Sequence, residues 1–133
     1  MITAARRLRS PLAHDERGSM SVQMVVIMPL MFLVAFTGLQ AGLFFYGRSA
    51  AMSAATTGAR AAAAEGGTIG DCRQAATAFI TSLGDVLTNP RIDCTRTATT
   101  VTARISGSTL SVIPGWTPLV DQQAVQQVER ISR

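Results

Sequence analysis

The sequence predicts an α+β membrane protein in which a long N-terminal transmembrane helix continues into an Ala-rich stem. A second helix and a small antiparallel sheet follow. Three observations predict this order: 25 residues from Val22 to Tyr46 without a charge, an Ala-rich run directly after them, and β-branched alternation after Pro90. We therefore divide the chain into a basic cytoplasmic leader (1–18), a transmembrane helix (19–47), an Ala-rich helical stem (48–66) and a small extracytoplasmic α+β domain (67–133).

The charge-free stretch is long enough to cross a membrane. As a helix it rises about 37 Å, whereas the hydrocarbon core of a bilayer is about 30 Å thick. The nearest charge after it is Arg48, and four arginines precede it: Arg6, Arg7, Arg9 and Arg17. Positive charge close to a span stays in the cytoplasm, so we expect a single-pass protein of the cell membrane with its N-terminus inside. A cleaved secretory signal, cut near Ser49-Ala50-Ala51, is the alternative that the length of the run disfavours.

The residues after the span predict two helical segments and a sheet. The Ala-rich run from Arg48 continues the first helix to about Glu65, where Gly66-Gly67 ends it. Apolar residues at three-to-four spacing predict a second helix from Asp71 to Leu87, capped by Asp71 or Thr68 and stopped by Asn89-Pro90. A β-branched strand segment over residues 91–105 follows, which alternates at Thr97, Thr99, Val101, Ala103 and Ile105. A turn at Ser106-Gly107-Ser108 and a short return strand from Thr109 to Ile113 come next. Pro114 to Pro118 is a rigid loop, in which we expect Trp116 to cover the core.

Two further patterns concern contacts between segments. Gly38 and Gly42 have the G-x-x-x-G spacing that allows helices to approach closely, with Gln40 between them as a polar cross-link. Cys72 and Cys94 are an even pair on the predicted outer side, which favours one disulfide over two buried thiols. Pro29 inside the span removes one backbone donor and predicts a bend.

The segment around Gly18 resembles a known family. Arg17-Gly18-Ser19, followed by an apolar run with Pro29 about ten residues on, resembles the processing site of type IV prepilins. Residues 16–66, with Gly58-Ala59-Arg60 soon after the span, resemble the TadE-like proteins of the tight-adherence pilus system. The resemblance implies that a membrane-embedded prepilin peptidase cleaves between Gly18 and Ser19. It also favours a third strand at residues 122–131, where the pattern alone fits helix or strand.

One residue departs from the prepilin pattern. Prepilins carry Glu at the fifth mature position, which is Gln23 here. A carboxylate in the bilayer is costly unless it is paired, and Gln removes both that cost and the ion pair. The departure favours a minor or accessory role over that of a major pilin.

The composition argues against several other functions. The one histidine, His14, lies in the leader, so no extracytoplasmic serine has a histidine to activate it, and no metal site or cofactor is expected. The eight arginines after the span form no cluster, which argues against nucleic acid as a partner. We therefore expect a structural protein, not an enzyme, whose partners are the membrane, the prepilin peptidase and other pilin-like subunits or pilus assembly proteins. The alternative is an uncleaved single-pass anchor whose outer domain binds another envelope component.

Overall fold

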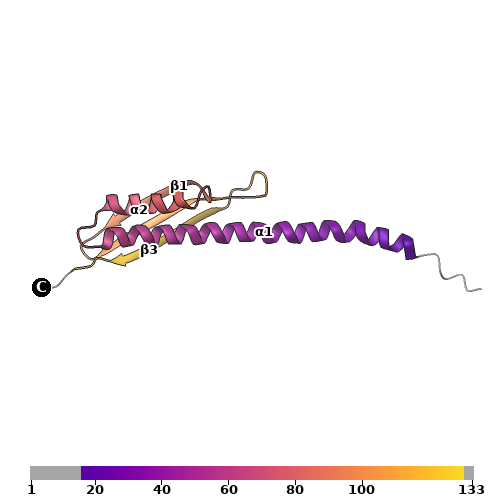
Figure 1. Cartoon of the computed structure of the whole chain (residues 1–133), viewed down its shortest axis with the longest axis horizontal. Helices are drawn as coiled ribbons and strands as arrows, with labels where there is room; N and C mark the ends of the chain where they lie inside the picture. The colour runs from indigo at the N-terminus through magenta and orange to yellow at the C-terminus, as the bar shows by residue number, and fades with distance from the viewer. Residues whose placement is uncertain (1–15, 131–133) are drawn as a thin grey trace, which may run out of the picture. The chain divides into compact units, whose positions relative to one another are not determined.

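The computed structural model describes residues 16–130 and confirms the predicted fold class. Its elements, labelled in Figure 1, are α1 (Glu16–Ala63), α2 (Ile69–Ser82), β1 (Leu87–Arg96), β2 (Thr100–Thr109) and β3 (Leu119–Gln127). Most of the expected leader, residues 1–15, lies outside the described residues. The chain divides into two compact units, one up to Thr37 and one from Gly38 onward. We call the second unit the head.

The N-terminal unit is an apolar part of α1. The helix is uninterrupted at Pro29, and from Ser21 to Leu39 every side chain is exposed. An 18-residue window of α1 has a mean hydropathy of 2.2, so the helix is long and apolar enough to span a membrane. A helix that is apolar on all sides has no water-facing surface, which fits a lipid environment. The hydroxyl of Thr37 donates to the Leu33 carbonyl at 2.7 Å, so this polar side chain is satisfied within the helix.

The head begins with the second half of α1, which carries the alanine-rich stem. The stem helix ends at Ala63, two residues before the expected Glu65, and Gly66 follows with a positive φ of 72°. Glycine adopts this left-handed conformation more readily than other residues do, so the Gly66-Gly67 pair ends the helix as predicted.

Helix α2 is shorter than the sequence predicted. Thr68 is its N-cap: the Thr68 hydroxyl accepts from the Asp71 N–H at 3.2 Å, and the Asp71 carboxylate accepts from the Thr68 N–H at 2.7 Å. The helix ends at Ser82, not at Leu87, because Gly84 adopts a positive φ of 75° and reverses the chain. Leu87, expected in the helix, is instead the first residue of β1 and is buried there.

The sheet is an antiparallel meander in the order β1-β2-β3. The expected turn at Ser106-Gly107-Ser108 is wrong: these residues lie inside β2 and pair with β1 and β3. The return strand expected at Thr109 to Ile113 is also wrong, because residues 110–118 form a loop, which we call the β2–β3 loop. The third strand is confirmed as β3, which starts at Leu119, three residues earlier than expected, and ends at Gln127. Residue 131 of the expected strand lies outside the described residues. Trp116 in the loop is 47% exposed and does not cover the core.

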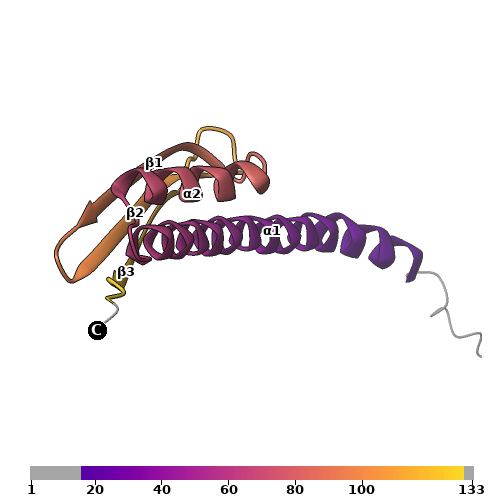
Figure 2. The same ribbon diagram turned by 60° about the vertical axis from the view of Figure 1, so that its left-hand side comes forward.

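The core of the head lies between the stem helix, α2 and one face of the sheet. Figure 2 shows α2 running alongside the C-terminal part of α1. The alanines of one stem face are fully buried, as are alternate residues of β2 (Val101, Ala103 and Ile105). Alanine side chains are small, so α2 and the sheet pack closely against this face of the stem and cover it.

Candidate functional site

The predicted processing site lies at the start of α1. Gly18 and Ser19 belong to its first turn, which begins at Glu16. The first four N–H groups of a helix lack helical acceptors, so this turn costs little to unwind. A peptidase that binds an extended substrate could therefore reach the Gly18–Ser19 bond without disturbing the rest of the helix.

Gln23 lies about one turn further along, on the apolar surface of the N-terminal unit. Its side chain is exposed and lies beside Met24, Ile27, Met28 and Met31. An amide among apolar side chains in lipid seeks a hydrogen-bond partner, since an unsatisfied polar group there is costly. Gln23 is thus suited to a polar contact with a neighbouring helix.

The G-x-x-x-G pair is open. A Cβ atom built on Gly38 or on Gly42 meets no described atom within 4 Å, apart from the local helix backbone. The two glycines are four residues apart and so share one helix face. Their role in packing against another helix stays a prediction, and the surface they offer is uncovered by the described part of the chain.

Gln40 has a partner that the sequence did not reveal. Its side chain is 5% exposed, and its Oε1 accepts from the Val112 N–H at 2.8 Å and from the Ser111 hydroxyl at 3.2 Å. Both donors belong to the β2–β3 loop. The expected cross-link to another helix is therefore, for the carbonyl oxygen, a link to the chain's own loop. Within the described residues, the Gln40 Nε2 has no hydrogen-bond partner.

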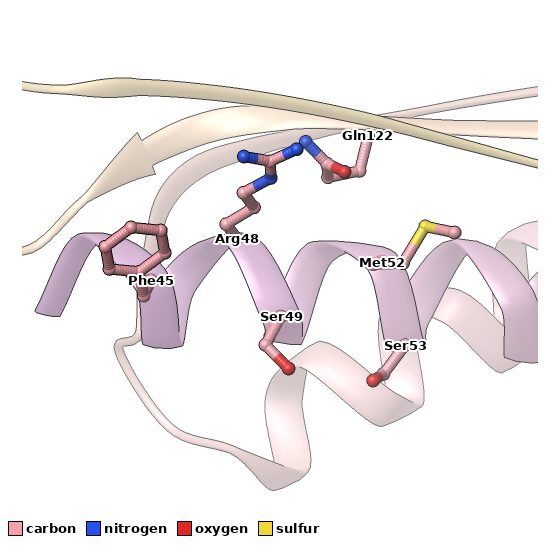
Figure 3. Close-up of a pocket in the computed structure, with 6 residues that line it drawn as sticks. All are labelled: Phe45, Arg48, Ser49, Met52, Ser53 and Gln122. Atoms are coloured by element: carbon pink, nitrogen blue, oxygen red, sulfur yellow. The ribbon is translucent and has the colours of Figure 1, made fainter. Parts of the chain in front are cut away.

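A shallow groove follows on the head, between α1 and β3. It is lined by Phe45, Arg48, Ser49, Met52, Ser53 and Gln122. Figure 3 shows the side chains of Arg48 and Gln122 directed toward one another across it. Arg48 is the first charge after the apolar run. Among the described residues, no group of three or more histidine, cysteine or acidic side chains is placed to hold a metal ion.

The expected disulfide is confirmed. Cys72 of α2 and Cys94 of β1 are bonded, with their Cα atoms 6.4 Å apart, and both are buried. Cys72 also lies against Gly58 of α1: a Cβ built on Gly58 would be 2.8 Å from the Cys72 carbonyl oxygen. Gly58 was missed as a packing residue, although it is the glycine of the Gly58-Ala59-Arg60 segment. Because Gly58 has no Cβ, α2 can approach α1 closely at Cys72, the residue of α2 that forms the disulfide.

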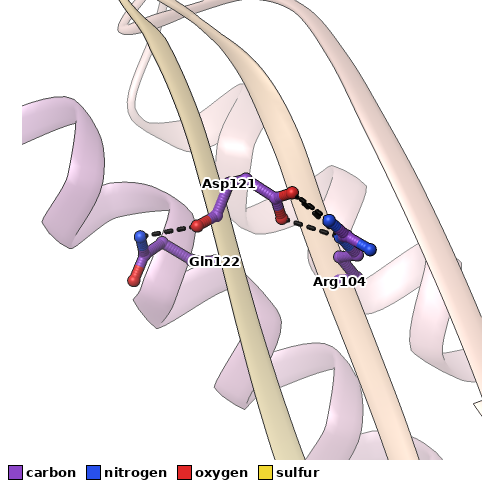
Figure 4. A network of polar contacts seen from close by, with 3 residues as sticks. All are labelled: Arg104, Asp121 and Gln122. Atoms are coloured by element: carbon purple, nitrogen blue, oxygen red, sulfur yellow. Dashed lines mark hydrogen bonds and ion pairs between the residues drawn. The ribbon is translucent and has the colours of Figure 1, made fainter.

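The exposed face of the sheet carries an ion pair. The Arg104 Nε donates to the two carboxylate oxygens of Asp121 at 2.8 and 3.0 Å, and Nη2 also contacts Oδ2 (Figure 4). The Gln122 Nε2 donates to the Asp121 carbonyl at 2.7 Å. Hydrogen bonding from Arg104 lowers the pKa of Asp121. Because both side chains are about half exposed, this pair between β2 and β3 contributes only modestly to stability.

Acid should destabilise the head through two aspartates. Hydrogen bonds from Thr68 lower the pKa of Asp71 below its ordinary value of 3.8, as Arg104 does for Asp121. A depressed pKa contributes stability above the ordinary value, and that stability is lost as the pH falls through the folded-state pKa. At pH values below about 3.8, we expect the denaturant concentration at the midpoint of unfolding to decrease as the pH is lowered. The fall should be shallower in Asp71→Asn and in Asp121→Asn, and shallowest in the double variant; equal slopes in all four proteins would contradict this.

Comparison with known proteins gives a match to part of α1. Residues 18–60 match the model of the TadE-like protein family. The TadE-like segment covers about a third of the chain, from Gly18 of the predicted processing site to Arg60 beside the buried Gly58. It confirms the resemblance found in the sequence, and the rest of the head lies beyond it. The searches of curated proteins and of solved structures gave no match.

Proposed function

We propose that this protein is a pilin-like accessory protein in the assembly of tight-adherence pili or a related secretion apparatus. The observation that carries the proposal is the TadE-like match, which begins at Gly18 of the prepilin-type site. The apolar first half of α1 supports an anchor in the cell membrane, and the arginines before it support a cytoplasmic N-terminus with the head outside. Prepilin peptidase would release a mature chain beginning at Ser19.

The action proposed is structural, by packing against other subunits. The alanine face of the stem is covered by α2 and the sheet of the same chain, so it is not the surface that partners use. The open surfaces of the helix are the Gly38/Gly42 face and the apolar residues around Gln23. With an uncharged amide at the fifth mature position, the protein is suited to accompany or start a filament of pilins and does not supply their ion pair. The proposal includes no catalysis, no cofactor and no nucleic acid.

The mature N-terminus of protein taken from the native membrane tests this proposal. We expect mass spectrometry to find a chain starting at Ser19, and Gly18→Val to abolish that start, because a branched side chain replaces the small residue at the cleavage site. Ser21→Ala, a small change three residues away, serves as the matched control and should be processed normally. An intact Met1 in the unaltered protein would instead favour the uncleaved anchor, and a cut near Ala51 would indicate a secreted protein.

A further inference from the structure

Outside α1, the exposed large apolar side chains of the head are concentrated in the β2–β3 loop and at Leu119, the first residue of β3. Outside α1, the described head has seven exposed large hydrophobic residues, and five of them lie within residues 110–119. We call these five the apolar loop surface: Leu110, Val112, Ile113, Trp116 and Leu119, which are 38–78% exposed. The sequence from Ile105 to Val120 contains no charged residue. Exposed large apolar side chains gathered in one short segment of a small domain mark that segment as a candidate contact surface.

The loop is held in place. At its base the Thr109 N–H donates to the Pro118 carbonyl at 3.0 Å, and Pro118 is buried. In the middle the Val112 N–H donates to the Oε1 of Gln40 on α1 at 2.8 Å, and the Ser111 hydroxyl also reaches this oxygen. The exposed side chains are therefore presented by an anchored segment, fixed to a particular residue of the helix.

Gln40, to which the loop is fixed, lies near the end of a helical run long enough to cross the hydrocarbon core of a bilayer. Gln40 falls inside the charge-free window from Gly18 to Gly47. A helix over the expected span, 19–47, would rise about 43 Å, well beyond a hydrocarbon core of about 30 Å. The 21 residues from Ser19 to Leu39 rise about 31 Å, which matches the core. The helix would thus leave the hydrocarbon at about Gln40, where the loop is attached.

We propose that the apolar loop surface inserts into the interfacial region of the outer leaflet, so that the protein contacts lipid through the loop as well as through the helix. Three features point to lipid as the occupant: the link to Gln40 at the end of a bilayer-length run, the lack of charge from Ile105 to Val120, and an exposed tryptophan. Tryptophan is enriched at the membrane–water interface, where its apolar ring and polar N–H are both accommodated. The inference requires that α1 spans a membrane and is independent of any role in a pilus.

Trp116 is the one tryptophan of the chain and reports directly on this contact. The full chain is reconstituted into phosphatidylcholine vesicles, with or without bromine on the acyl chains near the headgroup, and its emission is recorded. We expect shallow brominated lipid to reduce Trp116 emission by about twofold and aqueous iodide to reduce it little. The matched control is Trp116→Phe combined with Val125→Trp, since Val125 is 53% exposed on β3 and lies outside the loop. Its emission should show the opposite pattern.

The other outcomes overturn the inference in distinguishable ways. Protein that floats with the vesicles while Trp116 is quenched by iodide and not by brominated lipid has an aqueous loop. Emission protected from both quenchers, and changing with the protein-to-lipid ratio, assigns the surface to a second protein copy. Protein that fails to float with the vesicles refutes the membrane span itself.

Discussion

Removing the Cys72–Cys94 disulfide is expected to lower the free energy of unfolding of the head by about 3–4 kcal/mol. The bond joins α2 to β1 and closes a loop over a sequence separation of 22 residues. Without it, the unfolded chain has a higher conformational entropy, which favours unfolding. A domain of this size has a total stability of about 5–15 kcal/mol, so the loss is a large share of it.

The disulfide prediction is measured by denaturant unfolding of Cys72→Ala/Cys94→Ala in mild detergent, followed by Trp116 emission. Trp116 belongs to the head, whereas circular dichroism would be dominated by α1. Reduced unaltered protein is the control that separates loss of the bond from loss of the sulfur atoms. If the double variant and the reduced protein both unfold at the same denaturant concentration as the oxidised protein, the bond does not stabilise the head.

Gly58→Ala should destabilise the head although alanine favours helix. Helix propensity alone would stabilise by about 0.5–1 kcal/mol. The new Cβ, however, would lie 2.8 Å from the Cys72 carbonyl oxygen and 3.1 Å from the Ala76 Cβ, so α1 and α2 must move apart. Overpacking of this kind costs about 1–3 kcal/mol, which exceeds the gain. Gly58→Val should cost more, because it adds branches at the same contact.

Gly42→Ala is the matched control for Gly58→Ala, since it is the same change in the same helix. A Cβ there meets no described atom within 4 Å, so the variant should keep or slightly raise the stability of the head. A loss of association with other subunits, without a loss of head stability, would support packing through the Gly38/Gly42 face. Equal destabilisation by both alanine variants would refute the assignment of Gly58 as the contact between α1 and α2.

The sequence predicted the elements whose signals are local and strong. A long apolar run continued by alanines leaves no choice but helix, and the Gly66-Gly67 pair ended it within two residues of the expected place. The part of the alternation at Val101, Ala103 and Ile105 identified the inner face of β2, because one side of a strand in a small domain must be buried. Its earlier members, Thr97 and Thr99, lie instead in the turn between β1 and β2. An even pair of cysteines on the predicted outer side indicated the disulfide, which joins α2 to β1.

The errors lie where tertiary contacts decide. Ser106-Gly107-Ser108 has turn composition, yet β2 is hydrogen-bonded on both sides and continues through it. The glycine has a role there: a Cβ on Gly107 would lie 3.3 Å from the Thr88 carbonyl, beside the register shift between Thr88 and Arg91 of β1. The actual reversal is at residues 97–99, where the hydroxyl of Thr97 accepts from the Thr100 N–H. The contact between Gln40 and the loop joins residues about seventy positions apart, and no periodicity reports such a pair.

The order of the meander has a consequence for how the chain is made. Each strand pairs with its neighbour in sequence, so the sheet can form from local contacts as synthesis proceeds. The alanine face of the stem is different: it shares a buried cluster with Val120 and Ala124 of β3, the last strand to be synthesised. Before β3 is made, the part of the alanine face that packs near Val120 and Ala124 lacks this cover, and the β2 edge that pairs with β3 lacks its partner. Because β3 covers both, the core of the head is complete only once β3 has paired with β2.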